Sequence, residues 1–218
     1  MNVPSRHTPA TLLVIAKAPL PGRVKTRLTP PYTPEEAARL AEAALVDTLH
    51  AVLRAPAHRR VLALAGEPGP WLPAGIDVVP QCAGGLDARL AGAFARCAGP
   101  TVLIGMDTPQ VTPALLAPAL AADAWRAADA WFGPAADGGF WALGLAEPDP
   151  ELLRGVPMST PSTGAIQRAR LSAAGLRVRD LPVLWDVDTA DDAARVAAAA
   201  PHTRFAAELA RLAPAGRP

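Results

Sequence analysis

The sequence predicts an α/β fold in which a largely parallel sheet is covered by helices on both faces. The run Thr11 to Ala16 reads TLLVIA, and the run Thr101 to Met106 reads TVLIGM. Continuous apolar runs of this kind are typical of strands that are buried on both faces. Segments with helical spacing lie between such runs, and strands that alternate with helices favour a parallel sheet. Ligands bind such sheets at the carboxyl ends of the strands.

The first helix is predicted from its start signal and from its spacing. Thr33 can cap it, Pro34 suits its first position, and Glu36 can complete a capping box. Apolar residues in the range 45–53 recur at intervals of three and four, so we expect the helix to extend to about Arg54.

The later elements are predicted from the same kinds of signal. Thr112 and Pro113 open a helix, and Asp137 with two glycines separates two apolar runs. After the first helix we expect strands at 61–65 and 76–80, a helix at 86–97, a strand at 101–106, a helix at 112–122, strands at 130–134 and 140–145, a helix at 162–174, a strand at 178–181, and two alanine-rich helices from Thr189.

Length and charge limit the classes of function. A chain of 218 residues suits one core, so we expect a single domain over 1–218, with 1–10 as a flexible N-terminal segment. The 21 basic and 20 acidic side chains give a formal charge of +1. Such a balance provides no global field for nucleic acid or an anionic membrane, so we expect neither as a partner.

Three features indicate a cytoplasmic protein. Cys82 and Cys97 form no CxxC pair, which suits a reducing compartment. The first ten residues, MNVPSRHTPA, lack the apolar stretch of a signal peptide. No apolar run approaches the ~18 residues that a membrane-spanning helix requires.

The loop after the first strand concentrates positive charge. Lys17, Arg23, Lys25 and Arg27 lie in it, and no acidic residue occurs between positions 17 and 28. Lysine and arginine bind phosphate oxygens, and this loop leaves the ligand edge of the sheet, so we predict anion binding. A solvated basic loop is the alternative. The loop has no GxxxxGK[ST] pattern, and the chain has no GxGxxG.

The KTRL stretch of this loop, residues 25–28, is predicted to be extended. Lys25 and Arg27 would then share the face that meets the phosphates, while Thr26 points elsewhere and Leu28 packs inward.

Carboxylates also follow the predicted strands. Asp107 comes directly after TVLIGM, and Asp186 and Asp188 alternate in WDVDTADD. Carboxylates at strand ends can hold Mg²⁺, which bridges phosphate oxygens. Turn formation is the alternative role for Asp107. Asp191 and Asp192 are interpreted instead as charges at a helix start behind a Thr189 cap.

Asp137, Gly138 and Gly139 form a further polar cluster between two predicted strands. The two glycines would let a ligand approach the backbone closely, although a plain hairpin turn also explains them. The four histidines lie outside these clusters, so the sequence shows neither a catalytic triad nor a zinc site.

Five stretches, taken in order, resemble the radical-SAM/selenodomain-associated transferase family: AKAPLPGRVKTRL, QCAGGLDARLAGAF, IGMDTPQ, GPAADGGFWALGL and DVDTADD. The resemblance covers nearly the whole chain. It implies a GT-A, nucleotide-diphospho-sugar transferase-like fold. The family is described as glycosyltransferase-like, with a link to arsenosugar pathways, and as similar to 2-phospholactate guanylyltransferase, whose loop after the first strand is similar to residues 25–28.

Together with the loop and the strand ends, this resemblance implies a set of site residues. The catalytic residues would be Lys25, Arg27 and Asp107; the nucleotide and phosphate ligands Lys17, Arg23, Lys25, Thr26 and Arg27; the metal ligands Asp107 with Asp186 or Asp188; and the acceptor ligands Arg89, Asp137, Gly138, Gly139, Ser159 and Thr160. Two stretches depart from the family pattern: Leu86-Asp87 stands where Leu-Gly is usual, and the residues after Ser159-Thr160 differ.

These expectations describe a transferase with Mg²⁺ or Mn²⁺ as cofactor. Its donor would be a nucleoside triphosphate or a nucleotide-sugar, and its acceptor a small phosphorylated or hydroxylated molecule. The basic loop favours a nucleotidyltransferase, because it suits a triphosphate that loses pyrophosphate. A nucleotide-sugar-dependent glycosyltransferase is the alternative, and a non-catalytic nucleotide-binding module is a further one.

Overall fold

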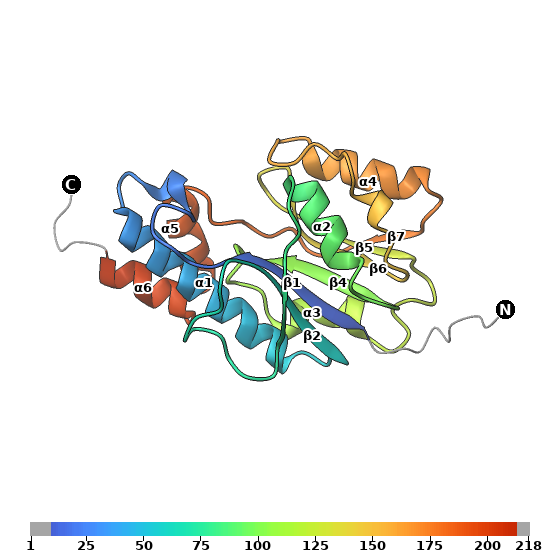
Figure 1. Ribbon diagram of the computed structural model, residues 1–218, viewed down its shortest axis with the longest axis horizontal. Coiled ribbons are helices and arrows are strands. Elements are labelled where there is room, and N and C mark those ends of the chain that lie inside the picture. The colour runs from blue at the N-terminus through green and yellow to red at the C-terminus, as the bar shows by residue number, and fades with distance from the viewer. Residues whose placement is uncertain (1–9, 213–218) are drawn as a thin grey trace.

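The computed structural model describes residues 10–212. Its sheet has seven strands in the order β3-β2-β1-β4-β6-β5-β7 (Figure 1). In chain order the elements are β1 (Thr11–Lys17), η1 (Thr26–Leu28), α1 (Pro34–Arg54), β2 (Arg59–Ala65), β3 (Asp77–Pro80), α2 (Leu86–Phe94), β4 (Thr101–Gly105), α3 (Pro113–Leu120), β5 (Ala130–Pro134), β6 (Phe140–Leu145), η2 (Pro150–Leu152), α4 (Thr163–Ala173), β7 (Val178–Asp180), α5 (Ala190–Ala199) and α6 (Arg204–Leu212).

The predicted parallel character of the sheet is confirmed for most of its strand pairs. β1 pairs in parallel with β2 and β4, β2 with β3, and β5 with β7. Only β6 runs the other way, against β4 and β5. The reversal follows from the tight turn after β5, which returns the chain as a hairpin beside its own strand. Because β1 and β4 are neighbours and run in parallel, their carboxyl ends lie next to each other at one edge of the sheet.

Helices cover both faces of the sheet, as predicted. Leu12 and Val14 of β1 point into a core that includes side chains of α1 and α3. Leu13 points to the opposite face, where it joins a core with side chains of α2 and α4. A third cluster packs α1 against α5 and α6 (Figure 1). The alternation of apolar side chains along β1 thus buries this strand on both sides.

Element boundaries differ from the predictions by a few residues. Helix α2 ends at Phe94 rather than near Cys97, because the chain continues in tight turns in which Cys97 N–H donates to the Phe94 carbonyl at 2.9 Å. Helix α3 ends at Leu120 rather than near residue 122. The capping box of Thr33 and Glu36 is present at the start of α1.

The flexible segment expected at 1–10 lies outside the described residues, except for Ala10. Ala10 is buried, and its carbonyl accepts a hydrogen bond of 3.0 Å from His58 N–H. Within the described part of the chain, no helix combines the length and the apolar character needed to cross a bilayer.

Candidate functional site

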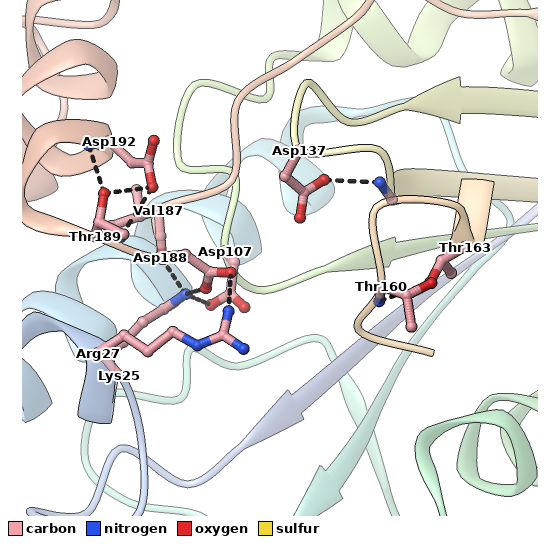
Figure 2. A network of polar contacts seen from close by, with 11 residues as sticks. Lys25, Arg27, Asp107, Asp137, Thr160, Thr163, Val187, Asp188, Thr189 and Asp192 are labelled. Atoms are coloured by element: carbon pink, nitrogen blue, oxygen red, sulfur yellow. Dashed lines mark hydrogen bonds and ion pairs between the residues drawn. The ribbon is translucent and has the colours of Figure 1, made fainter. Parts of the chain in front are cut away.

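Three charged side chains meet at the carboxyl edge of the sheet. Lys25 comes from the loop after β1, Asp107 follows β4, and Asp188 precedes α5. Lys25 Nζ lies 2.7 Å from Asp107 Oδ1 and 3.4 Å from Asp188 Oδ1 (Figure 2). The fold therefore brings together one predicted phosphate ligand and two predicted metal ligands, although they come from three distant parts of the chain.

The loop carries Lys25 to this position through a turn. The expectation of an extended KTRL segment is wrong: Lys25 has a left-handed backbone conformation, with φ of 48°, and Thr26–Leu28 forms the short helix η1. Leu28 N–H donates to the Lys25 carbonyl at 2.9 Å, and the Leu28 side chain is fully buried, as predicted. Arg27 remains largely exposed, yet its Nη1 lies 3.2 Å from Asp188 Oδ2. Tight turning, rather than alternation along a strand, brings Lys25 and Arg27 to one carboxylate.

Asp188 lies on residues 181–189, a segment that crosses the strand ends between β7 and α5; we call it the strap. Leu184 N–H donates to the Pro134 carbonyl at 3.2 Å, and Val187 N–H donates to the Asp107 carbonyl at 2.9 Å. At its end, Thr189 caps α5, as predicted, and Asp192 completes a capping box with it. The strap is therefore tied to β5, to the end of β4 and to a helix start, which holds Asp188 in place.

The charges in this cluster depend strongly on one another. Burial alone would lower the pKa of Lys25, but the attraction of Asp107 and Asp188 outweighs it and the pKa is raised. Asp186, also on the strap, behaves differently: burial and the charges of Asp107 and Asp137 raise its pKa to about 7, although Lys25 acts against the shift. Asp186 is thus a carboxyl group that changes charge near neutral pH.

The donor set fits a divalent cation that is shared with phosphates. Asp107 Oδ1 is buried, and its partner is the Lys25 ammonium at 2.7 Å. Among the described side chains, no three His, Cys, Asp or Glu residues are gathered into a ready-made metal site. Mg²⁺ commonly uses only one or two carboxylates and completes its shell with water and phosphate oxygens. Asp107 and Asp188 suit that type of site.

The predicted acceptor residues of the β5–β6 hairpin lie beside the start of α4. Asp137 Oδ1 accepts a hydrogen bond of 2.8 Å from Gly139 N–H, and the Asp137 carboxylate lies between the Lys25 cluster and Thr160 (Figure 2). Gly138 has a φ of 91°, and a Cβ on it would lie 2.0 Å from the Pro161 carbonyl oxygen. Packing against residues 157–164 therefore requires a glycine at position 138.

Hydroxyl groups gather in the segment before α4. Thr160 Oγ1 lies 3.1 Å from Ser162 Oγ and 3.2 Å from Thr163 Oγ1. Thr160 N–H also donates to Thr163 Oγ1 at 3.0 Å, and Ser159 is exposed with a φ of 58°. These contacts order the segment that carries the predicted acceptor residues Ser159 and Thr160.

The remaining predicted ligands form no ion pair with the carboxylates of the Lys25 cluster within residues 10–212. Arg89 of α2 donates from Nε to the Gly84 carbonyl at 2.9 Å. Lys17, Arg23 and Thr26 are exposed, and neither Lys17 nor Arg23 joins an ion pair within residues 10–212.

Four hydrogen bonds, made by the side chains of Lys25, Gln81 and Asp87, were not predicted. Lys25 Nζ donates to the carbonyl of Val187. Gln81 Nε2 donates to the carbonyls of Ala16 and Ala63 at 2.7 and 2.9 Å, which joins the ends of β1 and β2. Asp87 accepts a hydrogen bond of 2.9 Å from Gly155 N–H, and this bond lowers the pKa of Asp87. Only Asp87 had a signal, as a departure from the family pattern.

A comparison with known protein families shows the family to which the chain belongs. The family described as "Uncharacterized protein conserved in bacteria (DUF2064)" matches residues 39–160, which is more than half of the 218 residues. The chain belongs to this family. None of the curated proteins is similar enough to match it.

Solved structures place this DUF2064 protein in a wider fold group. A "putative nucleotide-diphospho-sugar transferase" from Desulfovibrio desulfuricans G20 is 25% identical, with a TM-score of 0.81, over 93% of this chain and 94% of that chain. Rv0371c from Mycobacterium tuberculosis H37Rv, in complex with manganese, is 26% identical, with a TM-score of 0.55, over 87% of this chain and 97% of that chain.

A third structure shares the fold alone. The 2-C-methyl-D-erythritol 4-phosphate cytidylyltransferase from Thermus thermophilus is 17% identical, with a TM-score of 0.55, over 89% of this chain and 100% of that chain. Together these likenesses confirm the predicted nucleotide-diphospho-sugar transferase-like fold. The radical-SAM association and the similarity to 2-phospholactate guanylyltransferase stay predictions.

Proposed function

We propose that this protein is a nucleotide-dependent transferase that uses Mg²⁺ or Mn²⁺ and that transfers a nucleotidyl group to a small hydroxylated or phosphorylated acceptor. The observation that carries the proposal is the cluster of Lys25, Asp107 and Asp188 at the carboxyl edge of the sheet. In open α/β sheets this edge is where ligands bind. The manganese complex of Rv0371c, which is 26% identical, supports a divalent cation.

The residues would divide the work between donor and metal. Asp107 and Asp188 would hold the cation, with Asp186 beside them, and the bound cation would neutralise charge on the donor phosphates. Lys25 would bind the same phosphates as a mobile point charge, and Arg27 would add a guanidinium fork. Lys17, Arg23 and Thr26 would line the outer part of the donor site. Catalysis would then rest on positioning and on charge neutralisation, with no covalent intermediate required.

The acceptor would approach from the hairpin side. The Asp137 carboxylate is exposed, and only its Oδ1 accepts a hydrogen bond from its own turn, so it can receive one from an acceptor hydroxyl. Ser159 and Thr160 add hydroxyl groups, and Arg89, with the backbone of Gly138 and Gly139, would border the same space.

Glycosyl transfer from a nucleotide-sugar is a second candidate. The description of the Desulfovibrio protein, the structure with the highest TM-score given above, favours it. Both reactions use a basic loop and carboxylates, and they differ in which donor bond breaks. A nucleotide-binding module without turnover would share the binding site and lack both reactions.

A thermal-shift screen with nucleoside triphosphates and nucleotide-sugars, with and without Mg²⁺, tests the proposal. A ligand at one hundred times its Kd should add about 2.7 kcal/mol to the free energy of unfolding. We expect triphosphates to stabilise more than nucleotide-sugars, and pyrophosphate to compete with them. Tight binding of a nucleotide-sugar that ignores pyrophosphate would favour glycosyl transfer, and binding without Mg²⁺-dependent turnover would favour the module.

Asp107→Asn provides the matched test of the metal. The amide keeps the shape of the side chain and removes the charge, so the Mg²⁺-dependent part of the stabilisation and of turnover should be lost while the fold persists. Asp191→Asn, at an exposed position of α5, is the control and should retain both. Full Mg²⁺-dependent activity in Asp107→Asn would contradict the metal assignment.

A further inference from the structure

The Lys25 ammonium lies inside the carboxylate cluster rather than in solvent. Its side chain is only 7% exposed, although lysine ammonium groups are usually solvated. Nζ contacts Asp107 Oδ1 at 2.7 Å and Asp188 Oδ1 at 3.4 Å, and it donates to the Val187 carbonyl (Figure 2). This environment of two carboxylate oxygens and one carbonyl resembles the oxygen shell of a metal cation more than a phosphate-binding pocket.

The charge balance of the cluster explains why the ammonium lies there. Asp107 Oδ1 is a buried oxygen, and the Lys25 ammonium at 2.7 Å is the partner that the structure gives it. A buried carboxylate oxygen without a partner is costly, so a cation beside it is favourable. Among the described residues, Arg27 is ion-paired with Asp188 and is largely exposed, and Lys25 is the cation that compensates Asp107.

We propose that Lys25 is the internal counter-ion of the metal-free site, and that its ammonium group and a divalent cation are alternative partners of Asp107 and Asp188. This inference rests on the proposed function in one respect, the binding of a divalent cation. When the cation enters, the two carboxylates no longer need the ammonium. Lys25 is then released towards the donor phosphates, and because its long side chain is flexible, the release needs no movement of the backbone.

The exchange couples binding of the divalent cation to binding of the donor phosphates. A cation that frees Lys25 creates a phosphate ligand, and a phosphate that captures Lys25 leaves the carboxylates open for the cation. Such linkage is reciprocal and typically amounts to a factor of about 5–150 in affinity. A lysine that served only the phosphates would not affect binding of the metal alone.

Mn²⁺ binding in the absence of nucleotide tests the exchange. Titrations followed by the electron paramagnetic resonance of free Mn²⁺ would compare the wild type, Lys25→Met and Arg54→Met. Lys25→Met should bind Mn²⁺ about tenfold more tightly, since the competing ammonium is gone. Arg54→Met, which removes one positive charge at an exposed position in the last turn of α1, should match the wild type. Equal or weaker Mn²⁺ binding by Lys25→Met would overturn the inference.

A second measurement uses the unaltered chain, so it does not depend on the folding of a variant. The chain contains two lysines, Lys17 and Lys25, so trace acetylation with acetic anhydride can be read at both by mass spectrometry. Lys17 is the exposed internal reference. Saturating Mn²⁺ should raise the ratio of Lys25 to Lys17 acetylation by about tenfold.

The outcomes separate this inference from the proposed function. If Mn²⁺ binds and the acetylation ratio stays constant, the exchange is wrong while the transferase proposal stands. If Mn²⁺ binds to neither the wild type nor the variants, with or without triphosphate, the exchange and the metal-dependent proposal both fail. A rise in the ratio that is reversed by EDTA supports the exchange.

Discussion

At the scale of single residues, the site is a set of charges whose protonation depends on their neighbours. Asp186 and Asp188 are two positions apart on the strap, yet they differ in environment. Asp186 is largely buried, whereas Asp188 is ion-paired with Lys25 and Arg27. The two carboxylates therefore have different surroundings although they are close in the sequence.

Asp186→Asn should make the protein more stable at neutral pH in the presence of EDTA. Burial and the charges of Asp107, Asp137 and Asp188 raise the pKa of Asp186 to about 7 from 3.8, although the Lys25 ammonium acts against this shift. Between these values the folded protein keeps a proton that the unfolded chain has lost, so the stability of the wild type falls as the pH rises through this window. The variant has no titratable carboxyl group at position 186, so its stability does not fall for this reason.

Urea unfolding from pH 4 to pH 8 measures the effect. The advantage of the variant should be close to zero at pH 4, should grow through the window, and should level off above pH 7 at a value on the order of 1–4 kcal/mol. An advantage that does not change with pH would contradict the assignment.

Arg27→Lys should weaken binding of the donor although it keeps the charge. The substitution removes the planar guanidinium fork, which in the proposed site would bind two phosphate oxygens at once. Loss of such a charge-assisted contact costs about 1.5–3 kcal/mol, which is roughly tenfold to more than a hundredfold in affinity. Isothermal titration with the stabilising nucleotide, at one salt concentration, would compare it with Arg23→Ala. Equal and small losses would indicate a diffuse basic patch instead of a phosphate site.

At the scale of elements, the β5–β6 hairpin packs against the start of α4, where the proposed acceptor residues lie. Gly164 N–H donates to the Gly138 carbonyl at 2.8 Å, and a Cβ on Gly164 would lie 2.4 Å from the Gly139 carbonyl oxygen. The two backbones are therefore in direct contact, and larger side chains would separate them.

Gly138→Ala should destabilise the protein more than Gly175→Ala. Both glycines have positive φ, of 91° and 76°, so both substitutions carry the cost of that conformation, about 1–2 kcal/mol. Only at Gly138 would the new Cβ meet backbone, at 2.0 Å from the Pro161 carbonyl oxygen, while nothing lies within 4 Å at Gly175. Chemical unfolding of the two variants would show the difference, and equal losses would contradict the close contact.

At the scale of the whole molecule, helix α1 connects the sheet to the C-terminal helices α5 and α6. Its Leu45 and Leu49 pack on the sheet with α3, while its Leu40 packs with Phe205 of α6 and Val196 of α5. The C-terminal helices are therefore attached to the sheet through one long helix. We propose that the described residues form the single domain expected from the length of the chain.

A single domain predicts a single cooperative transition. Phe205→Ala, at a fully buried position of α6, should lower the global stability by about 3–5 kcal/mol, because the cavity it leaves is coupled to the sheet through α1. Far-ultraviolet circular dichroism and tryptophan fluorescence should give coincident unfolding curves for the wild type and the variant. Two separate transitions would mean that α5 and α6 unfold on their own.

The fold class and most elements were predictable from the sequence, because they depend on local signals. The apolar runs of β1 and β4, the Thr33 capping box and the paired runs around Asp137 all formed as expected. Burial and capping are preferences of short segments, so a short segment of sequence reveals them.

The tertiary structure decided what the charged residues contact. Lys25 was predicted to meet phosphates, and in the structure it is paired with Asp107 and Asp188, which lie 82 and 163 positions later in the chain. The turn at η1, the path of the strap and the ties made by Gln81 and the Val187 carbonyl have no signal in the residues themselves. They depend on long-range backbone contacts, which form only once the strands lie side by side. The sequence by itself therefore determined the sheet and its ligand edge, and the packing of distant segments determined which charge faces which.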